Sequence, residues 1–198
     1  MIPTLKTKRL TLRPFSISDQ DAMVDMIMSD MDVMYWLPGS DMVSTLEGQQ
    51  ELALEYITDF IEPWDELGFG VWAVCIKNIG LGTLGNFIGY CGFIPEQIEG
   101  AGPELAYAIG KSMWGTGLAT QALIACLDWI FLKPEVCRVY AVTDKENTAS
   151  RRVMKKIGMR HKKDVDLYNS VAKGGGLLPF YSIEREVYLL KTEAVPGE

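Results

Sequence analysis

Two glycines, Gly115 and Gly117, stand between an apolar run and a helical pattern in this chain of 198 residues. The run Leu105 to Ile109 is typical of a strand, and after Gly117 apolar residues recur at helical spacing. The start of a helix offers free backbone N–H groups and the positive end of the helix dipole, so it can hold phosphate without a basic side chain. Glycine lets such a ligand approach the backbone closely. We therefore predict a pyrophosphate-binding turn here.

Two other phosphate-binding motifs fit this segment less well. A P-loop needs a glycine, four residues and then Gly-Lys-Ser, and although Gly110-Lys111-Ser112 supplies the end, Leu105 stands where the first glycine belongs. A dinucleotide-binding fingerprint needs a third glycine where Thr120 stands, and an acidic residue further along the chain. A lone Gly-x-Gly is a weak signal for that fingerprint, which stays a minor alternative.

The segment resembles the acetyl-CoA loop of the GNAT acyltransferases, Gln/Arg-x-x-Gly-x-Gly/Ala, with Ser112 as a departure at the first position. Residues 147–159, Asn-Thr-Ala-Ser-Arg-Arg-Val-Met-Lys-Lys-Ile-Gly-Met, are similar to the segment that follows the fifth strand of that family. Residues 5–15 and 68–74 resemble its RimJ/RimL-like branch, whose members acetylate protein N-termini and small amines. The resemblance runs from residue 5 to residue 160, and its four motifs occur in the family's order.

This resemblance implies a fold and an activity. The fold is α/β (α+β), one domain over residues 1–198, with a mixed, mostly antiparallel sheet of about seven strands flanked by about four helices. The sheet splays between the strands at 103–110 and 136–142, where CoA lies. The activity is acetyl-CoA-dependent N-acetyl transfer, directly to a primary amine of a protein N-terminus or a small molecule.

The resemblance also assigns residues to the binding of CoA. Backbone groups at Ile109 would bind the thioester oxygen and the pantetheine amides. The basic helix face that includes Arg152 could meet the 3′-phosphate, although a solvated helix face explains most of its charges equally well. The full set implied for CoA is Ile109, Met113, Trp114, Gly115, Thr116, Gly117, Leu118, Ala119, Thr120, Asn147 and Arg152.

Acetyl transfer to an amine needs a base for the amine, donors for the carbonyl oxygen and a hydrogen bond or proton for the leaving thiolate. Glu104 is the candidate base, because in this family a glutamate at that strand position often serves, commonly through water. The alternative for Glu104 is a solvated carboxylate at the start of a strand. Asp164 and Asp166 are rival bases, since some RimL-like enzymes place an acidic residue there.

Ser150 is the candidate for the leaving thiolate, because the resemblance places it near the CoA sulfur and its hydroxyl can donate a hydrogen bond. It could equally help to satisfy the start of a helix, three positions after Asn147. Asn147 has the same two interpretations, a helix cap and an amide partner for pantetheine. Trp36, in a predicted loop, is the candidate that lines the acceptor pocket, while aromatic residues at strand spacing are treated as core.

The elements that must position these residues follow from periodicity, caps and turn residues. One predicted helix starts at Ser18 or Asp19, another ends before Pro134 and the last ends at Gly158 as a left-handed cap. The predicted strands are 10–15, 71–77, 86–94, 103–110, 136–142, 160–168 and 183–191. The predicted helices are 18–28, 45–61, the one after Gly117, and the one capped by Asn147; the predicted loops are 29–45, 79–85 and 170–179.

The composition, 48% hydrophobic and 23% charged, is that of an ordinary globular protein. A net charge of −7 argues against nucleic-acid binding, and no apolar run is long enough to cross a membrane. Because the N-terminus lacks the apolar core of a signal peptide, we expect a cytoplasmic protein. The expected partner is the amine acceptor, without nucleic acid or membrane, and a homodimer is left open.

The four cysteines, Cys75, Cys91, Cys126 and Cys137, lie singly in apolar segments with neither zinc-site nor disulfide spacing, so we expect buried free thiols and no metal. The single histidine, His161, lies in a basic run, and we do not expect it to be catalytic. Two other functions stay open. A non-catalytic CoA-binding sensor would share the glycine turn without needing a base, and an interaction module would use the fold alone.

Overall fold

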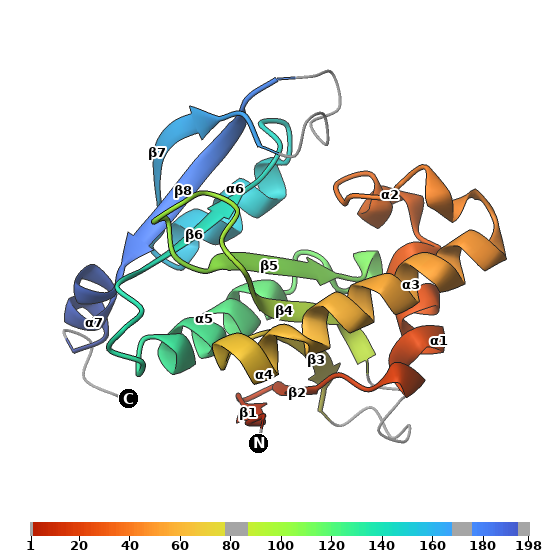
Figure 1. Cartoon of the computed structure of the whole chain (residues 1–198), viewed down its shortest axis with the longest axis horizontal. Coiled ribbons are helices and arrows are strands. Elements are labelled where there is room, and N and C mark those ends of the chain that lie inside the picture. Colours follow the sequence, from red (N-terminus) through yellow and green to blue (C-terminus); the bar gives the residue numbers. More distant parts are fainter. Residues whose placement is uncertain (1, 78–86, 168–175, 194–198) are drawn as a thin grey trace. The chain divides into compact units, whose positions relative to one another are not determined.

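The computed structural model describes residues 2–77, 87–167 and 176–193, and the chain folds into two compact units. The first unit comprises Met1–Ile94 and Ala106–Cys126, and the second comprises Pro95–Leu105 and Leu127–Glu198. Strand β5 (Glu104–Ile109) and helix α5 (Leu118–Ile130), both labelled in Figure 1, contribute residues to both units.

The first unit contains an antiparallel run of four strands in chain order, and β5 is the next strand in the order of the sheet. Strands β3 and β4 are buried along almost their whole length, as expected for continuous apolar runs. The strands are β1 (Leu5–Lys6), β2 (Leu10–Pro14), β3 (Val71–Ile76) and β4 (Phe87–Ile94).

A close approach of two strands requires the glycine in the middle of β4. Gly89 has a φ of +145°, and a Cβ there would lie 2.1 Å from the carbonyl oxygen of Ala108 and 2.9 Å from the Cα of Ile109. The register between β3 and β4 shifts at Val74 and Cys75, opposite this glycine, so a β-bulge lies there. Gly89 therefore lets the backbone of β4 pack directly on the end of β5.

The helices of the first unit pack on this sheet through one apolar face. Helix α3 (Leu46–Ile61) is capped by Thr45, whose hydroxyl accepts from Gly48 N at 3.1 Å, and it buries Leu52, Ile57 and Phe60. Phe60 packs against Phe15, with 5.6 Å between ring centroids. The other elements are η1 (Ile17–Asp19), α1 (Gln20–Met23), the π-helix η2 (Val24–Met28), α2 (Met31–Met34), η3 (Met42–Ser44), α4 (Pro63–Leu67) and η5 (Lys111–Met113).

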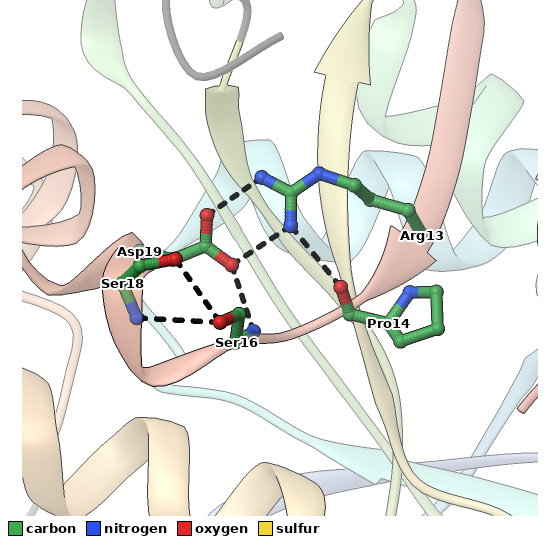
Figure 2. A network of polar contacts seen from close by, with 5 residues as sticks. All are labelled: Arg13, Pro14, Ser16, Ser18 and Asp19. Atoms are coloured by element: carbon green, nitrogen blue, oxygen red, sulfur yellow. Dashed lines mark hydrogen bonds and ion pairs between the residues drawn. The ribbon is translucent and has the colours of Figure 1, made fainter.

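A buried ion pair fixes the passage from β2 into the first helical segment (Figure 2). The Arg13 guanidinium donates to both carboxylate oxygens of Asp19 at 2.8 and 2.6 Å, and Asp19 is fully buried. The Asp19 carboxylate also accepts from Ser16 N at 2.9 Å, and Ser16 Oγ accepts from Ser18 N at 3.4 Å, which completes a capping box. Removing one partner of such a pair typically costs about 3–5 kcal/mol, so it determines where this helical segment starts.

The second unit contains the strand order β5-β6-β8-β7. Strand β6 (Arg138–Val142) is parallel to β5, with Glu104 opposite Tyr140, while β8 (Leu178–Glu184) is antiparallel to both β6 and β7 (Arg160–Val165). A small core of Ala101, Tyr140 and Phe180 packs on one face. Helices α6 (Thr148–Lys156) and α7 (Arg185–Glu193) complete the unit.

The predicted fold class is confirmed: the sheet is mixed and mostly antiparallel, with β5–β6 as its parallel pair. Within the described residues it has eight strands rather than about seven, since the two-residue β1 is too short to show a pattern in the sequence. The prediction of a strand over 183–191 was wrong, since the strand ends at Glu184 and α7 follows. The apolar run from Val187 to Leu190 resembles a strand, but Tyr188 is its one buried residue, as expected for one face of a helix.

Of the three predicted loops, the structure describes one in full. The predicted loop 29–45 contains α2 and η3, two helices too short to show a period. The predicted loop 79–85 and residues 170–175 of the loop predicted over 170–179 lie outside the described residues. Elsewhere the predicted boundaries of α3, β5 and β6 agree with the structure to within a few residues, and Gly158 ends α6 with a φ of +97° as predicted.

The cysteines depart from expectation at one position. Cys75, Cys91 and Cys126 are buried, but Cys137 is exposed, because it precedes β6 where the apolar run has not yet entered the sheet. Within the first unit the Sγ atoms of Cys91 and Cys126 lie 3.3 Å apart. Across the described ranges, no group of three or more potential metal ligands gathers, and no helix has the length and apolarity to span a membrane.

Candidate functional site

The glycine turn of the first unit is held by hydrogen bonds at its start. Gly110 N donates to Ile88 O at 2.9 Å, which ties the end of β5 to β4, and η5 follows at once. The Trp114 indole N–H donates to Ile109 O at 2.6 Å, so the tryptophan folds back over the strand end. The Ile109 carbonyl is therefore engaged inside the protein, and a role of Ile109 toward CoA would use its other backbone group.

The two glycines are required by backbone geometry. Gly115 and Gly117 have φ values of +74° and +78°, in the left-handed region that other residues rarely adopt. Apart from the adjoining residues of the chain, no described atom lies within 4 Å of a Cβ built on Gly115, and for Gly117 only Arg9 Nη2 does so, at 3.6 Å. Both glycines are exposed, while Thr116 Oγ1 donates to Met113 O at 2.6 Å. The turn thus leaves open space beside bare backbone, which is what a bound pyrophosphate requires.

Helix α5 begins directly after the turn. Gln121 N donates to Gly117 O at 3.1 Å, the first bond of the helix, so the N–H groups of Leu118, Ala119 and Thr120 precede the helical ladder. The Leu118 side chain is buried and anchors the helix start. The free donors and the dipole of this first helical turn favour an anion. The residues predicted to bind CoA from Met113 to Thr120 therefore form one continuous segment that ends at these donors.

Contacts from the helical segments reach the start of the turn. A Cβ on Gly110 would lie 2.3 Å from Met26 Sδ, on the π-helix η2, so that helix packs against the backbone where β5 ends. Lys111 forms an exposed ion pair with Asp32 of α2. Trp36, just after α2, is half-buried and packs edge-on against Tyr35, with ring centroids 4.6 Å apart. The predicted acceptor residue therefore follows a helix that the structure ties to the turn.

In the second unit, Glu104 is buried, with 5% exposure, so it is not the solvated carboxylate considered as an alternative. The Tyr140 hydroxyl donates to Glu104 Oε2 at 2.8 Å and accepts from Gln97 N at 2.9 Å. The Tyr140 ring stacks on Phe180 with centroids 5.1 Å apart. Burial, and secondarily the Glu104 charge, raise the pKa of Tyr140 above its ordinary value, so this hydroxyl stays a donor.

The rival carboxylates have different surroundings. Asp164, on β7, is exposed and its Oδ1 lies 2.7 Å from His161 Nε2, which is also exposed. Asp166, just past that strand, is exposed as well. A base must be held in a defined position, and of the three carboxylates Glu104 is the buried one with a neutral donor fixing its orientation.

The start of α6 carries the other predicted residues of the second unit. Asn147 is the helix N-cap, as predicted: its Oδ1 accepts from Ser150 N at 3.0 Å, which leaves its amide NH₂ outside the cap. The Asn147 N–H donates to Asp144 O at 3.1 Å, so this donor is satisfied by the preceding turn. Ser150 is half-buried and Arg152 is exposed, whereas Arg151 donates to the Tyr181 hydroxyl at 3.2 Å.

Comparison with known proteins identifies the family. The family model described as an acetyltransferase (GNAT) domain matches residues 9–160, so this chain belongs to that family and is an N-acetyltransferase by membership. It is 32% identical over 171 residues to the Bacillus subtilis (strain 168) protein YkkB, covering 83% of this chain and 90% of that protein. It is 26% identical over 157 residues to the uncharacterized N-acetyltransferase p20 of Bacillus licheniformis, covering 79% and 82%.

Among solved structures, the chain resembles RimL, titled a ribosomal L7/L12 alpha-N-protein acetyltransferase in complex with coenzyme A. The TM-score is 0.75 at 15% identity, with 93% of this chain and 99% of that chain covered. At that identity the likeness shows the fold, and it agrees with the RimJ/RimL-like resemblance of the sequence.

Several residues of the site were not found from the sequence. Gly89 had a signal, since a glycine inside a strand often marks a bulge or a close backbone approach. Tyr140 and Arg9 had none, because their contacts to Glu104 and Thr116 join residues far apart in the chain. The structure therefore adds one partner to the predicted base and one to the predicted phosphate turn.

Proposed function

We propose that this protein transfers the acetyl group of acetyl-CoA directly to a primary amine. The observation that carries the proposal is the turn at Gly115 and Gly117, whose left-handed backbone and open space precede the N-terminus of a 13-residue helix. Its family membership supports the same donor, since the GNAT family uses acetyl-CoA. In this proposal the backbone from Met113 to Thr120 binds the pyrophosphate of CoA.

The reaction needs no covalent enzyme intermediate. The uncharged amine forms a bond to the thioester carbonyl carbon, the carbon–sulfur bond breaks, and the sulfur leaves as a thiolate that takes up a proton. Glu104 accepts the proton that the amine loses, directly or through a water molecule. The Tyr140 hydroxyl donates to this carboxylate and fixes its orientation, and a donor of this kind favours the charged form of an acid.

The first turn of α6 supplies the second unit's part of the proposal. Ser150 donates a hydrogen bond to the developing thiolate, and the amide NH₂ of Asn147, which the helix cap does not use, binds pantetheine. The exposed guanidinium of Arg152 meets the 3′-phosphate of CoA.

For the acceptor we propose a protein N-terminus or a small amine, lined on one side by Trp36. The support is the RimJ/RimL-like resemblance and the likeness to RimL, which is described as an alpha-N-protein acetyltransferase. A half-buried indole after α2 offers an apolar surface for the carbon skeleton next to an amine.

The test is release of free CoA thiol from acetyl-CoA in the presence of an amine panel that includes N-terminal peptides, amino acids and polyamines. We expect amine-dependent release, with acetylated amine detected by mass spectrometry in equal amount. Binding of CoA by calorimetry without turnover on any amine would instead indicate a CoA sensor. No binding of CoA at all would refute the phosphate turn.

A further inference from the structure

Arg9 stands beside the glycine turn, although it lies more than a hundred residues away in the sequence. It directly precedes β2, and its own carbonyl accepts from Lys77 N at 2.9 Å, which continues the β2–β3 ladder and fixes its backbone. Its Nη1 donates to Thr116 O at 2.9 Å, and its Nη2 lies 3.6 Å from the position of a Cβ on Gly117. The guanidinium thus borders the open space that the two glycines leave.

A second contact holds the same hairpin on α5. Thr7 Oγ1 donates to Gln121 Oε1 at 3.1 Å and accepts from Leu10 N at 2.9 Å, within the turn that joins β1 to β2. The hairpin is therefore attached to the first turn of α5 independently of Arg9. Because of this, the Arg9 guanidinium is not needed to hold the hairpin in place, and its position by the turn calls for another explanation.

The charge of Arg9 is uncompensated at this place. Among the residues that the structure describes, no carboxylate pairs with Arg9, whereas Lys111, the basic residue within the turn segment, is paired with Asp32. A cation near a helix N-terminus is electrostatically unfavourable, because that end carries the positive end of the dipole. In a protein with a net charge of −7, a carboxylate could readily have been placed there. An anion bound at the turn removes this conflict.

We infer that Arg9 is a phosphate-binding residue of the turn: Nη1 stays on Thr116 O and orients the guanidinium, and the remaining N–H groups donate to the pyrophosphate of CoA. Arginine suits this role because its planar fork keeps one edge on the backbone and presents another to phosphate oxygens. The inference rests on the proposed acetyl-CoA-dependent function, and it adds a side chain to a site otherwise built from backbone.

The experiment compares Arg9→Ala with Lys8→Ala, which removes a charge from the exposed neighbouring residue. Acetyl-CoA and acetyl-pantetheine, which lacks the phosphates, serve as donors. We expect Arg9→Ala to raise KM for acetyl-CoA at least tenfold with kcat little changed, and to leave kcat/KM for acetyl-pantetheine within about twofold. Lys8→Ala should leave both donors unaffected. Arg9→Lys should keep part of the wild-type affinity for acetyl-CoA at low salt, with a KM between those of the wild type and Arg9→Ala. At high salt its KM should approach that of Arg9→Ala, because the attraction of a point charge is screened.

Three results would overturn the inference. One is an unchanged KM for acetyl-CoA in Arg9→Ala. Another is an equal loss with both donors, which would make Arg9 a structural support of the turn. If Arg9→Ala does not fold, Arg9→Lys takes its place. The third overturning result is then an Arg9→Lys variant whose KM for acetyl-CoA, and the dependence of that KM on salt, are those of the wild type. Failure of the wild-type chain to bind CoA would instead count against the proposed function itself, so the two failures are distinguishable.

Discussion

The glycine turn and the surroundings of Glu104 are built in opposite ways. In the turn, the groups available for a ligand are backbone N–H donors, exposed by Gly115 and Gly117, and few side chains intervene. Around Glu104, the groups are side chains, and the carboxylate is buried and bonded to Tyr140. The turn can thus bind an anion with little regard to neighbouring side chains, while the buried carboxylate depends on a side-chain partner that fixes its orientation.

This difference predicts how each region responds to substitution. The turn should be sensitive to any added side chain, because space and backbone angle define it. The Glu104 region should be sensitive to changes in charge and hydrogen bonding at constant shape. Four substitutions test the contrast, beginning with the largest expected effect.

Glu104→Gln keeps the shape of the side chain and loses its proton-accepting charge. We expect CoA binding to be retained and kcat to fall by about 10² to 10⁴, the usual contribution of a general base. In the wild type kcat should rise with pH through one ionisation and level off, and in the variant this rise should move to more alkaline pH. A pre-steady-state burst measurement must first show that chemistry limits the rate. With chemistry limiting, an unchanged pH profile would move the base to Asp164, Asp166 or water.

Gly117→Val adds a side chain to the turn at a φ of +78°. We expect at least about tenfold weaker acetyl-CoA binding, roughly 1.4 kcal/mol, because the side chain would occupy the space of the pyrophosphate. Gly100→Val is the matched control, since Gly100 also has a positive φ, +72°, and nothing within 4 Å of a Cβ among the described residues. It should cost similar stability and leave CoA binding unchanged. A folded Gly117→Val protein with wild-type affinity by calorimetry would refute the phosphate turn.

Tyr140→Phe removes the hydrogen bond to Glu104 without changing the ring that stacks on Phe180. A donor to a carboxylate favours the charged form of the acid, so without this donor we expect the rise of kcat with pH to move to more alkaline pH. Burial and the Glu104 charge raise the pKa of Tyr140 above its ordinary value of about 10. Ionisation of Tyr140 therefore cannot be the cause of a rise in kcat at lower pH.

Tyr181→Phe is the control for this variant, because it also removes a buried tyrosine hydroxyl, one that accepts from Arg151. Its stability loss should be comparable and its pH profile unchanged. Equal pH profiles in the two variants would mean that Tyr140 supports the fold and does not tune the base.

The same contrast explains what could be predicted from the sequence. Gly115 and Gly117 were predictable as a turn because backbone conformation leaves a local signature, and the Asn147 cap was predictable for the same reason. The Tyr140 contact was not, because it depends on the parallel pairing of β5 with β6, which no local pattern specifies.

The prediction of secondary structure failed where two local signals competed. Val187 to Leu190 fits either a strand or a helix, and the choice depends on packing, which in α7 buries Tyr188 and bonds its hydroxyl to Asp128 at 2.7 Å. The exposure of Cys137 likewise depends on where the sheet begins, which its apolar neighbours do not reveal.

Ser150→Ala should have the smallest effect of the four, and it tests a residue that lies at a helix cap. The cap itself uses Ser150 N and Asn147 Oδ1, and alanine keeps that backbone N–H. The helix start should therefore persist, and Tm should change little. Because the thiolate forms only as the reaction proceeds, the lost hydroxyl should lower kcat more than it weakens CoA binding.

A single neutral hydrogen bond contributes about 0.5–1.5 kcal/mol, so the expected fall in kcat is roughly two- to tenfold. Thr148→Ala, which removes an exposed hydroxyl from the same helical turn, is the control and should leave kcat unchanged. A more acidic thiol in the donor should narrow the difference between wild type and Ser150→Ala, since a better leaving group needs less help from the hydroxyl. If Tm falls while turnover per folded molecule does not, and donor acidity has no influence, Ser150 serves the helix alone.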